Sequence, residues 1–548
     1  MKSQFVATLF VCAALAACDS GDINLNPSTS DNSTDNSVTN SNNTAAAPVA
    51  EENPCASYVN SGGQTIEGDF DGVNCTYSPA FADAGNNITT DITIPELASG
   101  GVHVFKGSLF VGEAHSNAAE LTAAGVAEGG DGPTLTIEAG ATLAWPDNTK
   151  FVIINRGSQL FAVGTQEKPI TFTATKDAVE GAAGPEDVQL WGGMVINGFG
   201  VSNKCEYTGT RGDDLALVGE CNIAAEGAEG LDESYYGGAN DDDSSGRLEY
   251  VVVKHTGAQV ANGDELNGIS FGGVGRNTII KNLQVYSTYD DGIEMFGGAV
   301  NFENFVAIYV RDDSIDVDEG YIGSVTNALV IQQETDGNRC VEADGIGSYS
   351  SKSDEFIQDM FARGLNSRPT IIGLTCIFSP SEGTHDPGAG LRLREGLWPT
   401  IQGAVVFGGY GEEVSAGDHW ALRVDDTVAS DGFALGNAAI SDSVFAAVTK
   451  SSKTIAGQDV SDWLQANSNT VFADLTASVD PTQAANTDLI LFSSSNGFYS
   501  VPAGDVVVND ASLPAQAVAR DILGAIAETN DWTAGWTFGL DQTFWFQQ

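Results

Sequence analysis

Acidic side chains recur along the middle of the chain at a nearly constant spacing. One pair of aspartates is followed by a second pair 22 residues later, and two single aspartates come shortly after it. Carboxylates held close together raise one another's pKa, and a bound cation relieves that cost. Calcium takes about six to eight oxygen ligands in proteins. The pattern therefore predicts a Ca²⁺ site, with a solvated acidic turn as the alternative. The candidate ligands are Asp290, Asp291, Asp312, Asp313, Asp316 and Asp318.

Arg392 and Arg394 are the basic residues whose spacing is most suggestive. They alternate within Gly390-Leu-Arg-Leu-Arg-Glu, so in a strand they share one face and could line a groove. The alternative is that they are surface charges paired with Glu395 and neighbouring acids. We find no nucleophile motif, no phosphate loop and no metal spacing among the five histidines. The sequence thus nominates no catalytic residue, and the question of enzymatic activity stays open, leaning against it.

Short β-type runs separated by Gly, Asn and Asp fill residues 100–450, and a repeat is visible among them. Gly268-Ile-Ser-Phe-Gly-Gly aligns with Gly292-Ile-Glu-Met-Phe-Gly-Gly, 24 residues later. Asn282, Asn304 and Asn327 recur at steps of 22 and 23. This period, with two or three short strands in each repeat, is typical of one coil of a parallel β-helix. Stacked coils lie about 4.8 Å apart, so these asparagines should form a hydrogen-bonded ladder.

The first coils carry a more specific signal. The chain contains Leu135-Thr-Ile-Glu-Ala-Gly-Ala-Thr-Leu, then Gly157-Ser-Gln-Leu-Phe-Ala-Val-Gly-Thr and Trp191-Gly-Gly-Met-Val-Ile-Asn-Gly. This string resembles the opening coils of many secreted right-handed β-helix proteins, over roughly residues 100–450. The resemblance implies an all-β, right-handed parallel β-helix solenoid. Pectate-lyase-like and related polysaccharide lyases share that fold and use Ca²⁺ with a basic residue, but the fold specifies an activity poorly.

The remaining segments suggest a domain plan. Residues 200–245 and 335–390 do not fit the coil pattern and are expected to be loops that leave the turns. Val460-Ser-Asp-Trp-Leu-Gln has apolar residues at helical spacing. We expect a signal peptide at 1–17, a flexible tether at 18–54, a disulfide-bearing N-terminal cap at 55–99, the β-helix at 100–450 and a mixed α/β C-terminal cap at 451–548.

The N-terminus predicts export and lipid attachment. An apolar run from Phe5 to Ala14 is too short to span a membrane and follows the basic Lys2. Leu15-Ala-Ala-Cys18 resembles the bacterial lipobox, which implies that Cys18 is acylated and becomes the mature N-terminus. We therefore expect a lipoprotein of the cell envelope, most simply at the outer membrane or cell surface. Asp19 leaves the choice of membrane open.

Six further cysteines are expected to form disulfides, because they are even in number and belong to an exported chain. Fifteen connectivities are open to them, and pairing between sequence neighbours is the simplest. It predicts three bonds: Cys55–Cys75, Cys205–Cys221 and Cys340–Cys376.

Charge narrows the choice of partner. The chain has 23 Lys and Arg against 74 Asp and Glu, a formal net charge of −51. Such a surface repels nucleic acids. Three functions remain: a binding protein for surface glycans or protein partners, which we favour; a calcium-dependent polysaccharide lyase or a glycoside hydrolase; and an envelope assembly component partnered with an outer-membrane receptor.

Overall fold

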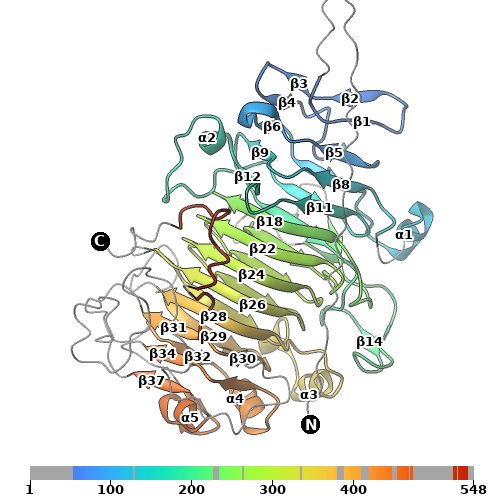
Figure 1. Ribbon diagram of the computed structural model, residues 1–548. Helices are drawn as coiled ribbons and strands as arrows, with labels where there is room; N and C mark the ends of the chain where they lie inside the picture. The colour runs from blue at the N-terminus through green and yellow to red at the C-terminus, as the bar shows by residue number, and fades with distance from the viewer. Residues whose placement is uncertain are drawn as a thin grey trace, which may run out of the picture. The chain divides into compact units, whose positions relative to one another are not determined.

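The computed structural model describes the folded body of the chain with several gaps (Figure 1). The described residues are 53–126, 130–225, 234–261, 264–333, 336–378, 388–408, 419–446, 453–467, 469–472, 523–527 and 529–540. The expected signal peptide at 1–17, the acylation site Cys18, nearly all of the tether at 18–54 and much of the cap at 451–548 lie outside them. None of the helices within the described ranges has the length and apolar character needed to cross a membrane.

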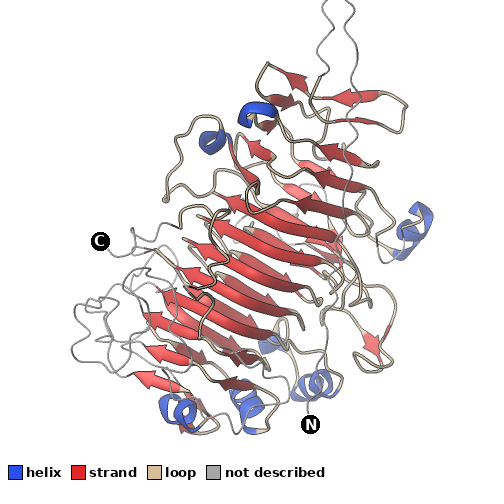
Figure 2. Cartoon of the chain, in the orientation of Figure 1, coloured by secondary structure: helices blue, strands red, loops and turns tan. Residues whose placement is uncertain are grey.

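Two long sheets make up the body, and their strands stack one coil above another (Figure 2). The nine-stranded sheet consists, in spatial order, of β32 (Leu422–Val424), β29 (Ala389–Arg394), β27 (Arg339–Asp344), β25 (Ile315–Asp318), β23 (Ile293–Phe296), β21 (Ile269–Gly272), β13 (Met194–Asn197), β10 (Val152–Ile154) and β7 (Leu109–Val111). All of its strands pair in parallel. The chain is therefore an all-β parallel β-helix.

The second sheet has eighteen strands, paired in parallel except for the β3–β4 hairpin. Its early strands are β3 (Asp69–Phe70), β4 (Cys75–Tyr77), β5 (Ile92–Ile94), β6 (His103–Phe105), β8 (Thr134–Ile137), β9 (Thr142–Trp145), β11 (Gln159–Val163) and β12 (Ile170–Ala174). The later strands are β18 (Gly246–Lys254), β22 (Ile279–Tyr286), β24 (Asn301–Ile308), β26 (Ser324–Ile331), β28 (Thr370–Phe378), β30 (Thr400–Gln402), β31 (Val405–Gly408), β33 (Ala439–Ser441), β34 (Val444–Ala446) and β37 (Thr470–Phe472).

Short hairpins and helices lie at the turns and the ends (Figure 2). The hairpins pair β1 (Ser57–Val59) with β2 (Thr65–Glu67), β14 (Tyr207–Thr208) with β15 (Ala216–Leu217), β16 (Ile223–Ala224) with β17 (Tyr235–Tyr236), β19 (Gln259–Ala261) with β20 (Asp264–Glu265), and β35 (Thr454–Ile455) with β36 (Gln458–Asp459). The helices are α1 (Ala118–Ala124), α2 (Thr175–Ala178), α3 (Asp354–Ala362), α4 (Thr427–Ala434) and α5 (Val460–Ala466).

The strand register confirms the repeat expected from the sequence. Ile269 lies opposite Ile293, and Ile293 lies opposite Ile315, so the 24- and 22-residue steps are successive coils. The Nδ2 of Asn304 donates to Oδ1 of Asn282, and Asn327 donates to Asn304 in the same way, each at 3.0 Å. These three asparagines have φ between 52° and 64°. Asn tolerates this left-handed conformation better than most residues, so the ladder also fixes one corner of each coil.

The interior is filled by side chains that point inward from both sheets. It holds stacked aromatics as well as aliphatic residues, with Trp145 and Trp191 stacked at a centroid distance of 4.5 Å. The structure contains the three disulfides that neighbour pairing predicted: Cys55–Cys75, Cys205–Cys221 and Cys340–Cys376. Cys340 and Cys376 are fully buried, so this bond ties β27 to β28 across the core.

The extent of the parallel β-helix differs from the expected one in two places. Parallel pairing reaches back to β4 and β5, inside the region expected as an N-terminal cap, because β4 pairs with β6 and β5 with β8. Within 335–390, expected to lie outside the coils, β27 and β28 belong to the two sheets. The charged residues of β27 and a long insertion after it hide this coil from the repeat.

The described C-terminal residues form two segments that pack in different places. The predicted helix near 460 is α5, and its Val460, Trp463 and Leu464 join the main core. Residues 523–527 and 529–540, which we call the C-terminal strap, cross the outside of β18, β22, β24, β26 and β28 (Figure 1). Ile526 and Trp536 of the strap cover an apolar stripe there that includes Val306, Ile308 and Leu329.

Candidate functional site

The outward-facing residues of the nine-stranded sheet form one unbroken row. Alternate residues of each strand point into the core, so one residue in the middle of each strand points out. In order along the solenoid, the register aligns Phe110, Ile153, Val195, Ser270, Glu294, Asp316, Glu342, Arg392 and Arg423. The row passes from apolar through acidic to basic residues, although the strands themselves are alike.

The acidic part of this face consists of seven side chains on two consecutive coils, those of β23 and β25, and we call it the acidic cluster. Its members are Asp290, Asp291, Glu294, Asp312, Asp313, Asp316 and Asp318. Two groups of three carboxylates have oxygens within 4.8 Å of one another: Asp290, Asp291 and Asp312 in one, Asp291, Glu294 and Asp316 in the other. These groups supply oxygen donors alone, which suits a hard cation such as Ca²⁺.

The acidic cluster is electrostatically costly. Burial, followed by the neighbouring carboxylates, raises the pKa of Asp291, Asp313, Asp316 and Asp318 well above the usual range. A buried carboxyl group is destabilised when charged unless a counter-charge lies beside it. Arg339, Arg394 and Lys204 offset part of this cost, and protons or a bound cation would offset the rest.

Two of the aspartates also have a structural role. Asp291 Oδ1 accepts the backbone N–H of Asp313 at 2.9 Å, and Asp313 Oδ1 accepts that of Arg339 at 2.9 Å. One coil earlier, Asn267 Oδ1 accepts the N–H of Asp291 at 3.2 Å. Each side chain therefore closes a hydrogen bond to the next coil, as the asparagine ladder does elsewhere, and one oxygen of Asp291 and of Asp313 serves the fold.

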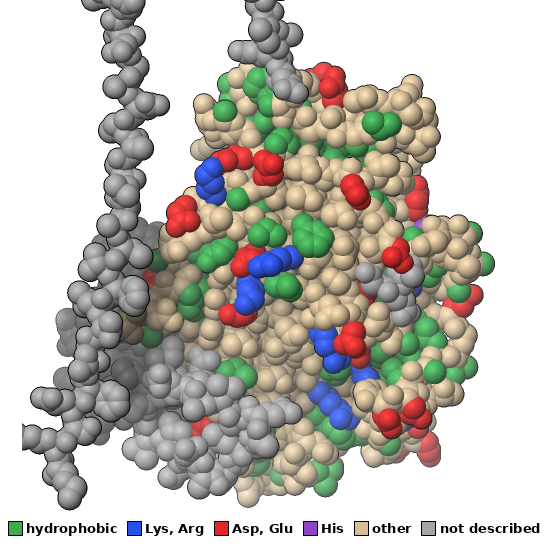
Figure 3. Space-filling view, turned by 45° about the vertical axis from the view of Figure 1, so that its right-hand side comes forward, with side chains coloured by type: hydrophobic (Ala, Val, Ile, Leu, Met, Phe, Trp, Pro, Cys, Tyr) green, Lys and Arg blue, Asp and Glu red, His purple; other side chains and the backbone are tan. Residues whose placement is uncertain are grey.

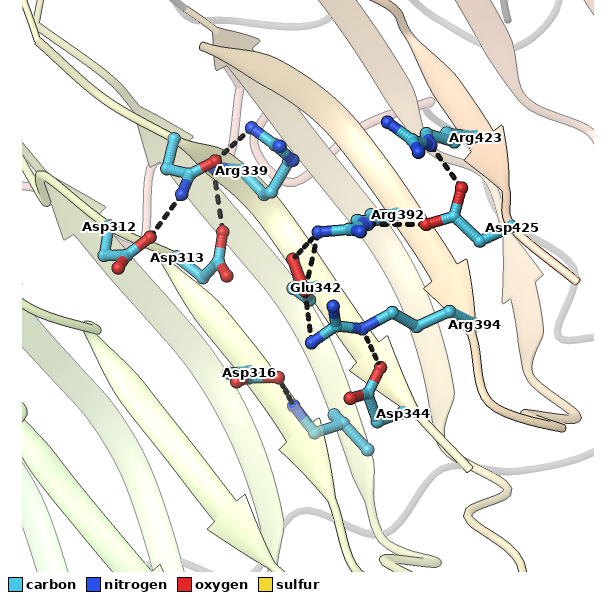
Figure 4. Close-up of polar contacts among 12 residues, drawn as sticks. Asp312, Asp313, Asp316, Arg339, Glu342, Asp344, Arg392, Arg394, Arg423 and Asp425 are labelled. Carbon is cyan, nitrogen blue, oxygen red and sulfur yellow. Dashed lines mark hydrogen bonds and ion pairs between the residues drawn. The ribbon is translucent and has the colours of Figure 1, made fainter. Parts of the chain in front are cut away.

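A second set of charges lies beside the acidic cluster on β27, β29 and the residues around β32 (Figure 4). We call Glu342, Asp344, Arg392, Arg394, Arg423 and Asp425 the arginine network. Arg392 donates from Nε to Asp425 at 2.8 Å and from Nη1 to Glu342 at 3.2 Å. Arg394 contacts Asp344 through Nε at 2.5 Å and Glu342 through Nη2 at 2.6 Å. Arg423 pairs with the second oxygen of Asp425.

Burial and pairing shift the pKa values within the arginine network. Burial alone would lower the pKa of Arg392 and Arg394, but the carboxylates beside them outweigh it and raise both. Burial raises the pKa of Asp344 to about 7 even though Arg394 opposes the shift. Burial would also raise the pKa of Asp425, but hydrogen bonds from Arg392 and Arg423 lower it. Both β29 guanidinium groups therefore stay charged.

Neighbouring side chains hold this region in place. The guanidinium of Arg339 lies 4.7 Å from the ring centroid of Trp420, and that of Arg423 lies 5.4 Å from it. On the other flank, the segment between β13 and β18 reaches the turn after β25. There, Ser202 Oγ and Tyr236 OH each donate to Glu319 Oε2 at 2.7 Å, and Lys204 pairs with the same carboxylate. The two flanks fix the position of the charged face.

The sequence-based metal prediction is only partly matched by geometry. Asp290, Asp291, Asp312 and Asp316 belong to the two close carboxylate groups, whereas Asp313 and Asp318 lie in neither. Glu294 is a ligand candidate that sequence reasoning missed. Its signal was its position one period of 22 residues before Asp316, opposite which it lies in the sheet.

The expected face shared by Arg392 and Arg394 is confirmed, since both point outward from β29 while Leu391 and Leu393 are buried. Their ion pairs are with Glu342, Asp344 and Asp425, and the charge of Arg394 also opposes the rise in the pKa of Glu395. Sequence reasoning did not find these three carboxylates. Glu342 and Asp344 come from β27, which lies 50 residues before β29.

Comparison with known proteins identifies the fold family. The model of the pectate-lyase-like β-helix domain matches residues 114–537. Among solved structures, the Dettilon tailspike protein matches with 12% identity and a TM-score of 0.21, over 64% of this chain and 68% of that one. No curated protein matches significantly. Because the family model covers most of the chain, this protein belongs to the pectate-lyase-like β-helix domain family.

Proposed function

We propose that this protein is a cell-surface glycan-binding protein, and that the glycan lies along the charged outer face of the nine-stranded sheet. The main support is a row of charged residues that crosses five strands in register: Glu294, Asp316, Glu342, Arg392 and Arg423. Arg392, Arg394 and Arg423 keep 20%, 31% and 27% of their side chains exposed. Ion pairing holds these donors and acceptors in place before a ligand arrives, which lowers the entropic cost of binding.

Binding is favoured over lyase chemistry by the state of the arginines. A β-elimination base must accept a proton, and a base works best when its pKa lies near the working pH. The carboxylates around Arg392 and Arg394 shift both pKa values in the opposite direction. Both guanidinium groups are therefore suited to donating hydrogen bonds and poorly suited to removing a proton.

Affinity electrophoresis in gels containing polysaccharides tests the proposed function. Arg392→Ala combined with Arg423→Ala should weaken retention by about tenfold or more, because both remove hydrogen-bond donors from the C-terminal end of the face. Arg247→Ala is a matched control, since Arg247 also pairs with a carboxylate, Glu249, but on the other sheet. Equal loss in the control and the double variant, or no retention by any polysaccharide, would refute the proposal.

One feature favours a second candidate, a glycoside hydrolase. Asp344 has a pKa of about 7 and can therefore exchange a proton at neutral pH, as a general acid must. Release of reducing ends from a polysaccharide panel, lost in Asp344→Asn but kept in Arg247→Ala, would establish this activity. Binding without product would leave the glycan-binding proposal as the better account.

Calcium is proposed as a ligand of the acidic cluster, at the groups Asp290–Asp291–Asp312 and Asp291–Glu294–Asp316. A cation there would offset the buried like charges. A ligand present at a hundredfold excess over its Kd stabilises the folded state by about 2.7 kcal/mol. Tm should therefore rise with CaCl₂ and fall with EDTA at constant ionic strength. Asp291→Asn, which removes a carboxylate ligand from both groups, should abolish the rise, whereas Glu303→Gln, on β24 of the other sheet, should keep it.

Membrane attachment is proposed through an acyl group on Cys18, with localisation at the cell surface. The support is the Leu15-Ala-Ala-Cys18 sequence and the Ser-, Asn- and Thr-rich stretch that follows it. Labelled palmitate should enter the wild-type protein and be absent from Cys18→Ala. Equal labelling of both proteins would exclude a lipoprotein anchor at this residue.

A further inference from the structure

The formal charges of the arginine network cancel. It contains the three guanidinium groups of Arg392, Arg394 and Arg423, and the three carboxylates of Glu342, Asp344 and Asp425. Each guanidinium already lies against at least one of these carboxylates (Figure 4). Basic side chains on the face shown in Figure 3 likewise lie next to acidic ones. An anionic ligand would therefore have to displace a carboxylate from the protein to gain a full ion pair.

The surroundings of the network add to this cost. The seven carboxylates of the acidic cluster occupy the adjacent coils, and Asp316 faces Glu342 across the strand pair. The whole chain has a formal net charge of −51. A polymer with one negative charge per sugar would therefore be repelled along the full length of the face, since like charges close together are unfavourable.

The network nevertheless keeps hydrogen-bonding capacity toward solvent. A guanidinium has five N–H donors. The contacts of Arg392 with its carboxylates use Nε and Nη1, and those of Arg394 use Nε and Nη2. Among the described residues this leaves Nη2 of Arg392 and Nη1 of Arg394. Asp344 bonds to Arg394 through Oδ1, which leaves its Oδ2 as an acceptor toward solvent among the described residues. Fixed donors thus lie beside a fixed acceptor.

Neighbouring hydroxyl groups of a sugar match such a surface, because each hydroxyl can donate one hydrogen bond and accept others. We propose that the glycan recognised by the arginine network is a neutral, hydroxyl-rich polysaccharide and not a uronate or sulfated polymer. This inference rests on the proposed function and names its ligand class. Binding then depends on hydrogen bonds from preformed ion pairs, so it should vary little with salt.

A gel-retention panel tests the ligand class. The neutral probes are dextran, laminarin, glucomannan and galactan; the anionic probes are polygalacturonate, alginate and carrageenan. At least one neutral polymer should retain the protein, with less than about a twofold change between 50 and 500 mM NaCl, in both CaCl₂ and EDTA. Retention by an anionic polymer that falls with salt would overturn the inference but leave the proposed function intact. Retention by no polymer would defeat the proposed function itself.

A gain-of-binding variant sharpens the test. Glu342→Gln with Asp425→Asn removes both carboxylate partners of Arg392 but keeps similar side-chain shapes. The unpaired guanidinium groups should then bind polygalacturonate, which the wild-type protein should not. Thermal melting checks that the variant is folded, and Asp425→Asn alone serves if the double variant is not. Failure of a folded variant to gain polygalacturonate binding would contradict the idea that internal pairing excludes anions.

Discussion

The outward-pointing residues at the two ends of the nine-stranded sheet differ in chemical character, although both ends are built from the same kind of parallel strand. At the N-terminal end, Phe110, Ile153 and Val195 point outward and are buried beneath Ala225, Tyr236 and Leu266 from the insertions. Toward the C-terminal end, the same positions hold Glu342, Arg392 and Arg423. Strands of the same parallel sheet thus carry either apolar or charged outward residues, because the inward residues and the strand hydrogen bonds hold the coil together in both cases. The parallel coils alone therefore do not require charged residues at these positions, which is consistent with the proposed binding role.

The largest expected effect tests whether the apolar end tolerates charge. Ile153→Asp places a carboxyl where the side chain is fully buried and has no polar partner, so it should cost about 4 kcal/mol or more. Ile279→Asp is the control, because Ile279 is 40% exposed on β22 and its replacement should change Tm little. Differential scanning fluorimetry of both variants gives the comparison. Similar Tm values would mean that the apolar end is not sealed by its insertions.

At the charged end, removal of one member of a pair should cost less. Arg394→Ala leaves Asp344 without its guanidinium and weakens the neighbourhood of Glu342, so urea unfolding should show a loss of about 2 kcal/mol. Adding Asp344→Asn removes the unpaired charge and should recover part of that loss. If the double variant is less stable than Arg394→Ala, the two side chains do not act as a pair.

The pH dependence of the free energy of unfolding should report on the charged end of the row, through the raised pKa of Asp344. A carboxyl whose pKa is higher in the folded than in the unfolded state binds more protons when folded between those two values. The free energy of unfolding then falls as pH rises, by about 1.4 kcal/mol per pH unit for each such proton. Asp344 should contribute this fall between about pH 4, its unfolded value, and its folded pKa of about 7.

Urea unfolding at several pH values in EDTA measures this slope. Asp344→Asn should show a shallower fall than the wild-type protein over that interval. The slope of Ile279→Asp should match that of the wild type, because its new carboxyl is exposed and its pKa should change little on folding. A wild-type stability that falls less steeply than that of Asp344→Asn would show that the pKa of Asp344 is not raised by folding.

The smallest effect is expected at the outer edge of the arginine network. Arg423→Gln removes a side chain that is 27% exposed, and Asp425 keeps its bond to Arg392. The stability loss should stay below about 1 kcal/mol, the usual value of an exposed pair. A loss as large as that of Arg394→Ala would show that the stacking of Arg423 on Trp420 contributes more than its ion pair.

Much of the fold was predictable because consecutive coils repeat their spacing. The alignment of Gly268 with Gly292 is the strand register of β21 and β23, and the asparagine spacing is the ladder. The repeat could not be followed in the sequence where insertions interrupt the period. β27 and β29 pair although residues 345–388 separate them, so no constant spacing links Glu342 to Arg392. The carboxylate partners of Arg392 and Arg394 could therefore not be predicted from the sequence.

Most of the acidic cluster was predictable because its aspartates follow the same repeat, and Glu294 is the exception. Asp290, Asp291, Asp312 and Asp316 could be placed together by a 22-residue period. The same period relates Glu294 to Asp316, but a lone glutamate within an apolar strand is less conspicuous than a pair of aspartates. The hydrogen bonds from Asp291 and Asp313 to the backbone of the next coil depend on atomic positions, which no spacing specifies.

The C-terminal strap has a consequence for how the protein is made. Ala525 donates its N–H to Thr375, 150 residues earlier in the chain, and Phe538 exchanges two hydrogen bonds with Gln284, 254 residues earlier. During synthesis from the N-terminus, the apolar stripe on β18 to β28 therefore stays uncovered until the strap has emerged. Coils can stack in the order in which they are synthesised, but the apolar stripe is covered last. Translation products that stop before residue 523 would present this stripe to chaperones and proteases.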